Sequence, residues 1–338
     1  MPICFTATGL TRSISPHRSG WRILVLESLI AGSALVALGA FGTRRRAARR
    51  EARRKAAFPP LGRLVTVEGR RLHLVQIGSG PDLVMIHGAS ANLREFAMDL
   101  APRLSSQFRV TLIDRPGLGW SDAVPEDTPG EQARLMRLAA ESIGVTRPLV
   151  LGHSYGGAVA LAWAMQAPVA GLLMLSGVAM PWEGGLGLWY QVTASAMGRA
   201  VVVPLVTAFA PTRQIDRSIA ATFLPQQPPP GYSRAAGVGL LLRRDALAHN
   251  ARQVNTLLPH VQAMQPHYDT IRVPVEILHG DADTIVPAHI HAVPLAATLP
   301  DAALTLLPGL GHMPHQTQPE AVKAAALRLA ARAGLRLD

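Results

Sequence analysis

Cysteine and metal-binding patterns are nearly missing from this sequence. Its 338 residues include one cysteine, Cys4, so no disulfide can form within the chain. No cluster of Cys and His has the spacing of a zinc site, and His289 and His291 lie two residues apart instead of four. The sequence also contains no internal repeat. We therefore expect no metal, no cofactor and no repeat architecture.

Outside one short segment, the chain also lacks an excess of basic residues. Between residues 44 and 55, eight basic residues and one acidic residue account for most of the formal net charge of +11. A nucleic-acid groove requires basic side chains spread over a folded surface. The nearly neutral remainder of the chain therefore predicts no nucleic-acid partner.

An apolar run precedes this arginine block. Residues 23–41 are predominantly apolar, and a bilayer core requires about 20 helical residues. Basic residues are denser after the run than before it, so the positive-inside rule predicts that the following domain faces the cytoplasm. We expect an N-terminal tail over 1–22, a single-pass membrane anchor over 23–41 and a basic juxtamembrane linker over 42–58. Its arginines would attract anionic lipid headgroups. A cleaved secretory signal and a misassigned translation start are alternatives.

The rest of the chain alternates short apolar runs with helix-like stretches. The runs expected to form strands are 63–67, 72–77, 82–86, 109–113, 148–151, 171–176, 273–278 and 303–307. The stretches expected to form helices are 92–104, 130–143, 155–166, 288–298 and 319–333. This alternation predicts an α/β fold with a parallel sheet. It is interrupted at 181–266, which we expect to be a cap inserted in a core of residues 59–180 and 267–338.

A serine stands at the turn between an expected strand and an expected helix. The sequence there is Gly152-His153-Ser154-Tyr155-Gly156-Gly157, and the glycines permit strained dihedrals and close packing of helix against strand. Such a turn exposes the serine Oγ above a sheet. We expect Ser154 to attack an electrophilic carbonyl.

Partners for this serine follow later in the chain. An apolar strand runs into a turn with two aspartates, Asp281 and Asp283, either of which could orient a histidine. The base candidate is His312, which lies in a Gly-x-Gly-His-x-Pro loop, and His315 is its competitor. A neutral imidazole can accept the serine proton and return it to the leaving group.

Backbone amides are the expected donors to the oxyanion. One should be the N–H of Tyr155, directly after the nucleophile, and the other the N–H of Ala89 in the loop after the strand 82–86. The residues expected to contact substrate are His87, Gly88, Ser90, Trp182 and Trp189.

The order of these motifs resembles the α/β-hydrolase superfamily over roughly residues 60–335. The matching segments are His87-Gly88, Asp114-Arg115-Pro116-Gly117, the serine turn, Gly280-Asp281-Ala282-Asp283 and Gly311-His312. The resemblance implies a mostly parallel eight-stranded sheet with helices on both faces and a helical cap after strand 6. It also implies Asp283, not Asp281, as the orienting carboxylate. A serine at 154 disfavours the related dehalogenases and epoxide hydrolases, which attack with aspartate.

The expected function is therefore that of a membrane-anchored serine hydrolase. Ser154, His312 and Asp283 would cleave a small or medium apolar carboxylic ester through an acyl-enzyme. Hydrolysis of a lactone, an amide or a carbon–carbon bond, and perhydrolysis, are alternatives on the same triad. A non-catalytic ligand-binding protein of the same fold is the alternative from a different class.

Overall fold

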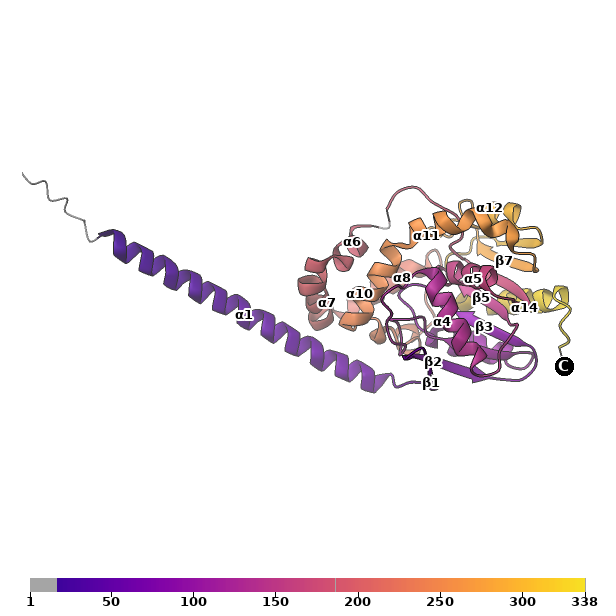
Figure 1. Ribbon diagram of the computed structural model, residues 1–338, viewed down its shortest axis with the longest axis horizontal. Helices are drawn as coiled ribbons and strands as arrows, with labels where there is room; N and C mark the ends of the chain where they lie inside the picture. Colours follow the sequence, from indigo (N-terminus) through magenta and orange to yellow (C-terminus); the bar gives the residue numbers. More distant parts are fainter. Residues whose placement is uncertain (1–16, 186, 338) are drawn as a thin grey trace, which may run out of the picture. The chain divides into compact units, whose positions relative to one another are not determined.

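The computed structural model describes residues 17–185 and 187–337 and contains the predicted mostly parallel eight-stranded sheet (Figure 1). Its strand order is β1-β2-β4-β3-β5-β6-β7-β8, and only β2 runs antiparallel to both of its neighbours. The strands are β1 Arg63–Val67, β2 Arg70–Ile77, β3 Asp82–Ile86, β4 Arg109–Ile113, β5 Leu149–His153, β6 Gly171–Leu175, β7 Val275–Gly280 and β8 Ala302–Leu307.

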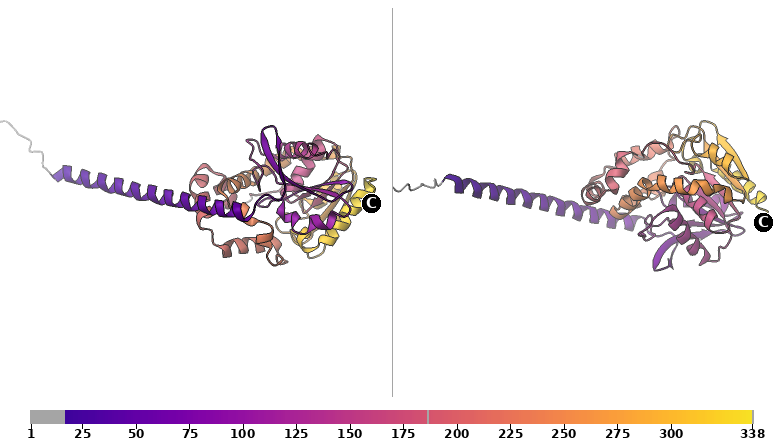
Figure 2. Two further views of the ribbon diagram at one scale, coloured as in Figure 1. Left: turned by 90° about the horizontal axis from the view of Figure 1, so that it is seen from below. Right: turned by 45° about the horizontal axis from the view of Figure 1, so that its top comes forward.

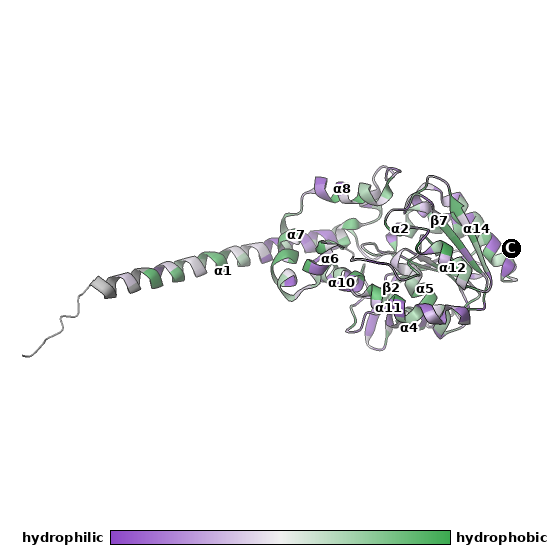
Figure 3. Cartoon of the chain, turned by 90° about the horizontal axis from the view of Figure 1, so that it is seen from above, coloured by the Kyte–Doolittle hydropathy of each residue, from purple (hydrophilic) through white to green (hydrophobic). Residues whose placement is uncertain are grey.

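Helices cover both faces of the sheet. α4 (Pro129–Glu141), α5 (Tyr155–Gln166) and α12 (Ala292–Thr298) contribute to the core on one face, and α3 (Leu100–Leu104) and α14 (Pro319–Arg332) to the core on the other. Every residue of β5 and β6 is buried, which explains why these strands are apolar without alternation. Figure 3 shows how hydrophobic and hydrophilic residues are distributed along the chain. The parallel strands β3, β5 and β7 all end at the same edge of the sheet, so the loops that follow them lie close together.

One of the helices predicted from the sequence, at residues 92–104, does not form as a single helix. The stretch 92–104 forms two short helices, α2 (Arg94–Ala97) and α3, instead of one. Pro102 lacks a backbone N–H, and its ring would clash with the preceding turn of a continuous helix. The chain therefore breaks at Asp99, whose backbone leaves the helical region with φ −152°.

The segment between β6 and β7 is helical and lies at one side of the core (Figure 2). We call residues 181–266 the cap. Its elements are α6 Leu188–Ala194, a π-helical turn Gly198–Val202, α7 Val203–Phe209, α8 Thr212–Phe223, α9 Tyr232–Ala235, a 3-10 turn Val238–Leu240, α10 Arg244–Asn255 and α11 Leu257–Met264. A 3-10 turn, Gln265–Thr270, leads back to β7, and α13 (Pro314–Thr317) precedes α14.

The N-terminal segment forms one helix, α1, from His17 to Ala57. Its described part from Val25 onward is long and apolar enough to cross a membrane, as a signal sequence near an N-terminus also is. The predicted linker at 42–58 is helical up to Ala57, because alanine, arginine, glutamate and lysine all have high helix propensity. Among the described residues, those from 17 to 46 form one unit, and Ala47 onward belongs to a second unit with the rest of the chain.

The end of α1 is packed on the cap. Arg50 donates to the carbonyl oxygens of Ala208 and Ala210 at 2.9 and 3.2 Å. Glu51 accepts two hydrogen bonds from the guanidinium of Arg244, at 2.9 and 2.8 Å. Part of the arginine block therefore has an intramolecular role that its sequence alone does not reveal.

Candidate active site

Ser154 lies at a sharp turn between β5 and α5. Its φ of 53° and ψ of −121° are a strained combination for a residue other than glycine. A Cβ at Gly152 would lie 2.3 Å from the carbonyl oxygen of Gly156, and one at Gly156 would lie 2.3 Å from that of Ile86. The flanking glycines therefore allow the helix to approach the strands closely enough to form this turn.

Asp283 and His312 are hydrogen-bonded partners from the loops after β7 and β8. The His312 Nδ1 lies 2.8 Å from the Asp283 Oδ2, and both side chains are buried. The other carboxylate oxygen accepts the backbone N–H groups of Ile285 and Val286, each at 2.9 Å. An ionised carboxylate accepts only, so Nδ1 of His312 donates and Nε2 is left as the basic nitrogen.

The Asp283 carboxylate is held in its ionised form. Burial would raise its pKa, but hydrogen bonds from His279 and His312, with that of the Val286 amide, outweigh this and hold the pKa well below its usual range. The carboxylate is therefore charged at every pH at which a histidine can act as a base.

The competing aspartate and histidine occupy different environments. Asp281 accepts the backbone N–H of Gly309 at 2.6 Å and is exposed, so it shapes the turn. His315 is fully buried, with its Nε2 3.2 Å from the Glu95 Oε1. Of the two aspartates that the sequence left open, the structure brings Asp283 to His312.

A cavity of about 560 Å³ lies over Ser154. Ser154 and His312 line it, as do three of the residues that the sequence singled out, Ala89, Ser90 and Trp189. Gly88 lies against the nucleophile, because a Cβ there would be 3.0 Å from the Ser154 Cβ. The amide of Tyr155 starts α5 directly after the serine.

Three of the expected substrate contacts, His87, Gly88 and Trp182, do not line this cavity. Trp182 is partly buried and packs its ring against His291, with centroids 5.8 Å apart. His87 is fully buried and bonds to the backbone only. Substrate contact at these two residues stays a prediction, which their absence from the cavity lining does not favour.

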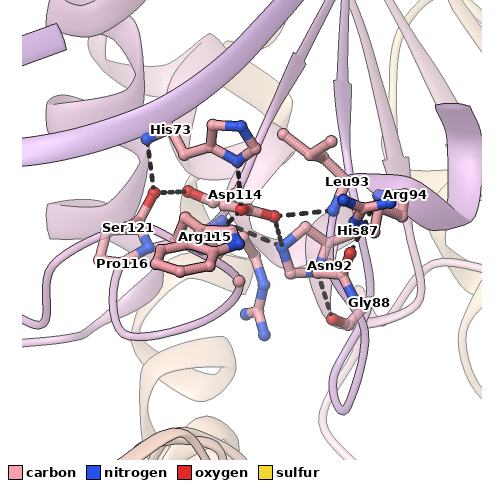
Figure 4. Close-up of polar contacts among 12 residues, drawn as sticks. His73, His87, Gly88, Asn92, Leu93, Arg94, Asp114, Arg115, Pro116 and Ser121 are labelled. Atoms are coloured by element: carbon pink, nitrogen blue, oxygen red, sulfur yellow. Dashed lines mark hydrogen bonds and ion pairs between the residues drawn. The ribbon is translucent and has the colours of Figure 1, made fainter. Parts of the chain in front are cut away.

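His87 and Asp114 instead hold the loop that carries Ala89 (Figure 4). The His87 Nε2 accepts the backbone N–H of Arg115 at 3.0 Å, and Nδ1 lies 2.9 Å from the carbonyl oxygen of Gly88. Asp114 accepts the N–H of Leu93 at 2.8 Å and pairs with Nδ1 of His73 at 2.7 Å. These contacts tie the loop after β3 to β2 and β4.

The pH dependence of the free energy of unfolding should depend on the protonation of His87. Burial, with the charge of Arg115, lowers the pKa of His87 to about 4, whereas an unfolded histidine titrates near 6.5. As pH falls from 6.5 towards 4, only the unfolded state takes up this proton, so the folded state loses stability. We expect this residue to contribute about 2 kcal/mol to the loss between pH 6.5 and 5. Melting curves of wild type and His87→Asn across this range should show a shallower slope for the variant; equal slopes would contradict the assignment.

A buried polar cluster that the sequence did not reveal lies behind His312. The His153 Nε2 donates to the carbonyl oxygen of His312 at 3.0 Å, and the ring of His153 contacts that of His315, with centroids 4.3 Å apart. Glu95 accepts the hydroxyl of Tyr232 at 2.9 Å. Glu95, His153 and His315 offer ligand atoms within 4.8 Å of one another, close enough for a metal ion. Although the His315 Nε2 lies 3.2 Å from the Glu95 Oε1, neither ring nitrogen of His315 has a partner in hydrogen-bonding geometry within the described part of the chain. The residues come from three distant segments, and no local spacing could have identified them.

Comparison with known proteins defines the class. A sequence model described as the alpha/beta hydrolase family matches residues 83–325, so the chain belongs to this family. The pimeloyl-[acyl-carrier protein] methyl ester esterase of Edwardsiella ictaluri is 30% identical over 260 residues, which cover 72% of this chain and 91% of that protein. The magnesium-chelatase 30 kDa subunit of Rhodobacter capsulatus is 29% identical over 243 residues, or 70% and 82% of the two chains.

Solved structures agree with this fold. An alpha/beta hydrolase fold protein from Burkholderia ambifaria superposes with a TM-score of 0.67 and 26% identity, covering 79% of this chain and 97% of its own. A membrane phospholipase A described as a bacterial virulence factor superposes with a TM-score of 0.61 and 21% identity, covering 93% and 99%. The chain is thus an alpha/beta hydrolase, with hydrolases among its relatives.

Proposed function

We propose that the chain is a membrane-anchored serine hydrolase that cleaves a carboxylic ester through an acyl-enzyme on Ser154. The single observation that carries the proposal is the buried Asp283–His312 pair, which opens on the same cavity as Ser154. His312 would take the proton of Ser154 as its Oγ attacks the ester carbonyl, and then give that proton to the leaving alkoxide. Water would release the acyl group with the same histidine as base. The backbone N–H groups of Ala89 and Tyr155 would stabilise the tetrahedral oxyanion.

The composition of the cavity supports an apolar ester. The residues that line it include the polar Ser90, Asn250 and Tyr232, and Leu241, Leu247 and Ile285 offer aliphatic surface for an acyl chain. A pocket with both polar and aliphatic lining residues fits a substrate whose carbonyl carbon joins a hydrocarbon chain. A small or medium apolar ester is therefore the substrate class that we propose.

A ligand-binding protein that catalyses nothing is the second candidate, because one relative is named as a chelatase subunit. A fluorophosphonate probe separates the two, since it reacts only with a serine activated by a base. We expect the probe to label the folded full-length protein on Ser154, and labelling to disappear in Ser154→Ala. A folded wild-type protein that stays unlabelled would favour the binding protein.

The anchor belongs to the same proposal. We propose that residues 23–41 span a membrane once and that the arginine block keeps the catalytic domain on the cytoplasmic side. The length and apolarity of α1 support the span.

Truncation at two places should separate anchoring from folding. A chain starting at Ala47 should no longer be an integral membrane protein, so that a carbonate wash releases it, and should keep its ester turnover, because the second unit begins there. A chain starting at Ala56 should also leave the membrane but lose stability, because Arg50, Glu51 and Arg54 all bond to the cap. Fractionation and melting curves of the two chains measure both effects. Recovery of the full-length protein in the soluble fraction would contradict the anchor.

A further inference from the structure

The cap carries an exposed apolar surface on α6, the π-helical turn and α7. Its members are Leu188, Trp189, Met197, Val201 and Leu205, whose exposed fractions run from 44% to 77%. We call these five residues the apolar face of the cap. Monomeric soluble proteins seldom expose large apolar side chains together, and such a group marks a binding surface.

The charge of this segment indicates what binds there. Between Leu188 and Ala210 the chain has one charged residue, Arg199, and no acidic residue. α6 and the helical segment Gly198–Phe209, bent by 87° from one another, together have the length and apolarity of a membrane span. A surface helix pair with apolar side chains, a basic residue and no carboxylate suits the interface of a bilayer with anionic headgroups.

The number of residues between the proposed span and the cap limits how far apart the two can be. Arg50 is bonded to the carbonyl oxygens that end α7, and Arg54 donates to those of Thr207 and Leu242. Arg50 follows Phe41, the last residue of the proposed span, by nine residues. A chain of that length reaches about 30 Å at most, so α7 cannot be far from the membrane if residues 23–41 cross it.

The same helices form a wall of the catalytic cavity. Trp189 of α6 and Val206 of α7 line it together with Ser154, and Trp189 is also a member of the exposed face. The cap therefore has one side on the nucleophile and another side apolar and exposed. An acyl chain leaving the bilayer at the cap would reach the aliphatic part of the cavity without crossing water.

From these observations we propose that the apolar face of the cap rests in the bilayer interface and that the substrate is an acyl ester of a membrane lipid. The inference rests on the proposed function, since Ser154 cleaves the ester. Its Oγ forms a bond to the acyl carbon, the lipid alcohol leaves with the proton held by His312, and water then releases the fatty acid and regenerates the serine. Arg50, Glu51 and Arg54 hold the cap in place relative to the juxtamembrane helix.

A lipid-depth measurement on the full-length protein tests the contact. With Cys4→Ser removing the native thiol, Met197→Cys and the control Leu306→Cys on edge strand β8 each receive an NBD fluorophore. Met197 and Leu306 are 77% and 41% exposed. In vesicles of phosphatidylcholine and phosphatidylglycerol, we expect NBD at 197 to shift to the blue and to be quenched severalfold by lipid with doxyl on acyl carbon 5. NBD at 306 should show neither effect.

Activity assays test the substrate class separately. Met197→Asp and Val201→Asp place a charge where the interface is apolar, so hydrolysis of a long-chain diacyl phospholipid in the vesicles should fall at least tenfold. Hydrolysis of dispersed p-nitrophenyl butyrate should stay within twofold of wild type, which also shows that the variants fold. The matched control Leu306→Asp should change neither activity.

The outcomes distinguish the inference from the function on which it rests. Wild-type protein that turns over neither substrate overturns the proposed function. Turnover of p-nitrophenyl butyrate without turnover of vesicle lipid, or an NBD group at 197 that behaves like the one at 306, overturns the inference alone. The NBD group at 197 could instead be shielded from water without being quenched by the doxyl lipid, with the shielding increasing with the amount of protein per vesicle. That result would assign the apolar face of the cap to a contact with a second copy of the chain and would also overturn the inference.

Discussion

Replacing Ser154 by alanine should lower kcat for p-nitrophenyl butyrate by about a million-fold, the loss seen when a serine nucleophile of this kind is removed. Alanine keeps the backbone turn but has no Oγ to form the acyl-enzyme, so the remaining rate comes only from binding and from the oxyanion donors. Because Ser154 is 9% exposed and its side chain is small, the melting temperature should change little. The measurement is steady-state kinetics of the full-length protein in detergent.

The control for this loss is a serine that lies near the site without a catalytic role. Ser90 lines the same cavity, and its hydroxyl accepts from the amide of Asn250 at 3.0 Å. Ser90→Ala should therefore lower turnover far less than Ser154→Ala. A Ser154→Ala protein that keeps a tenth or more of the wild-type rate would exclude the acyl-enzyme mechanism.

Replacing Asp283 by asparagine should lower kcat by about ten-thousand-fold. The asparagine amide can donate towards His312, so the imidazole would no longer be held with its proton on Nδ1 and its free nitrogen towards the serine. The loss should be in kcat more than in KM, because no substrate contact is removed. The loss follows from the hydrogen bond of 2.8 Å between Asp283 and His312.

Asp281 provides the matched control two residues earlier. It accepts a single N–H, from Gly309, and an asparagine keeps the oxygen that accepts it. Asp281→Asn should therefore stay within about twofold of the wild-type rate. If Asp281→Asn were the variant with the large loss, the orienting carboxylate would be Asp281 and the role proposed for Asp283 would fail.

Local sequence patterns were sufficient for the sheet and for the turn at Ser154. Strands buried on both faces require continuous apolar runs, and six such runs marked the strands from β3 to β8 to within a few residues, whereas two short β-rich runs marked the hairpin of β1 and β2. The sequence pattern around Ser154 likewise predicted the need for glycine at 152 and 156. The structure gives the reason, because a Cβ at either position would lie 2.3 Å from a backbone carbonyl oxygen. The break between α2 and α3 was missed, although Pro102 carried its signal.

The amino-acid sequence by itself determined the fold, the position of the candidate nucleophile and the apolar run of α1, since each depends on residues close together in the chain. The family resemblance favoured Asp283 over Asp281, and in the structure Asp283 is the one bonded to His312. Only the tertiary structure decided that His87 supports a loop instead of facing the cavity, and that Arg50 and Glu51 bind the cap. These contacts join residues from 28 to nearly 200 positions apart. Side-chain direction at such distances is set by the packing of whole elements, which no local pattern of residues specifies.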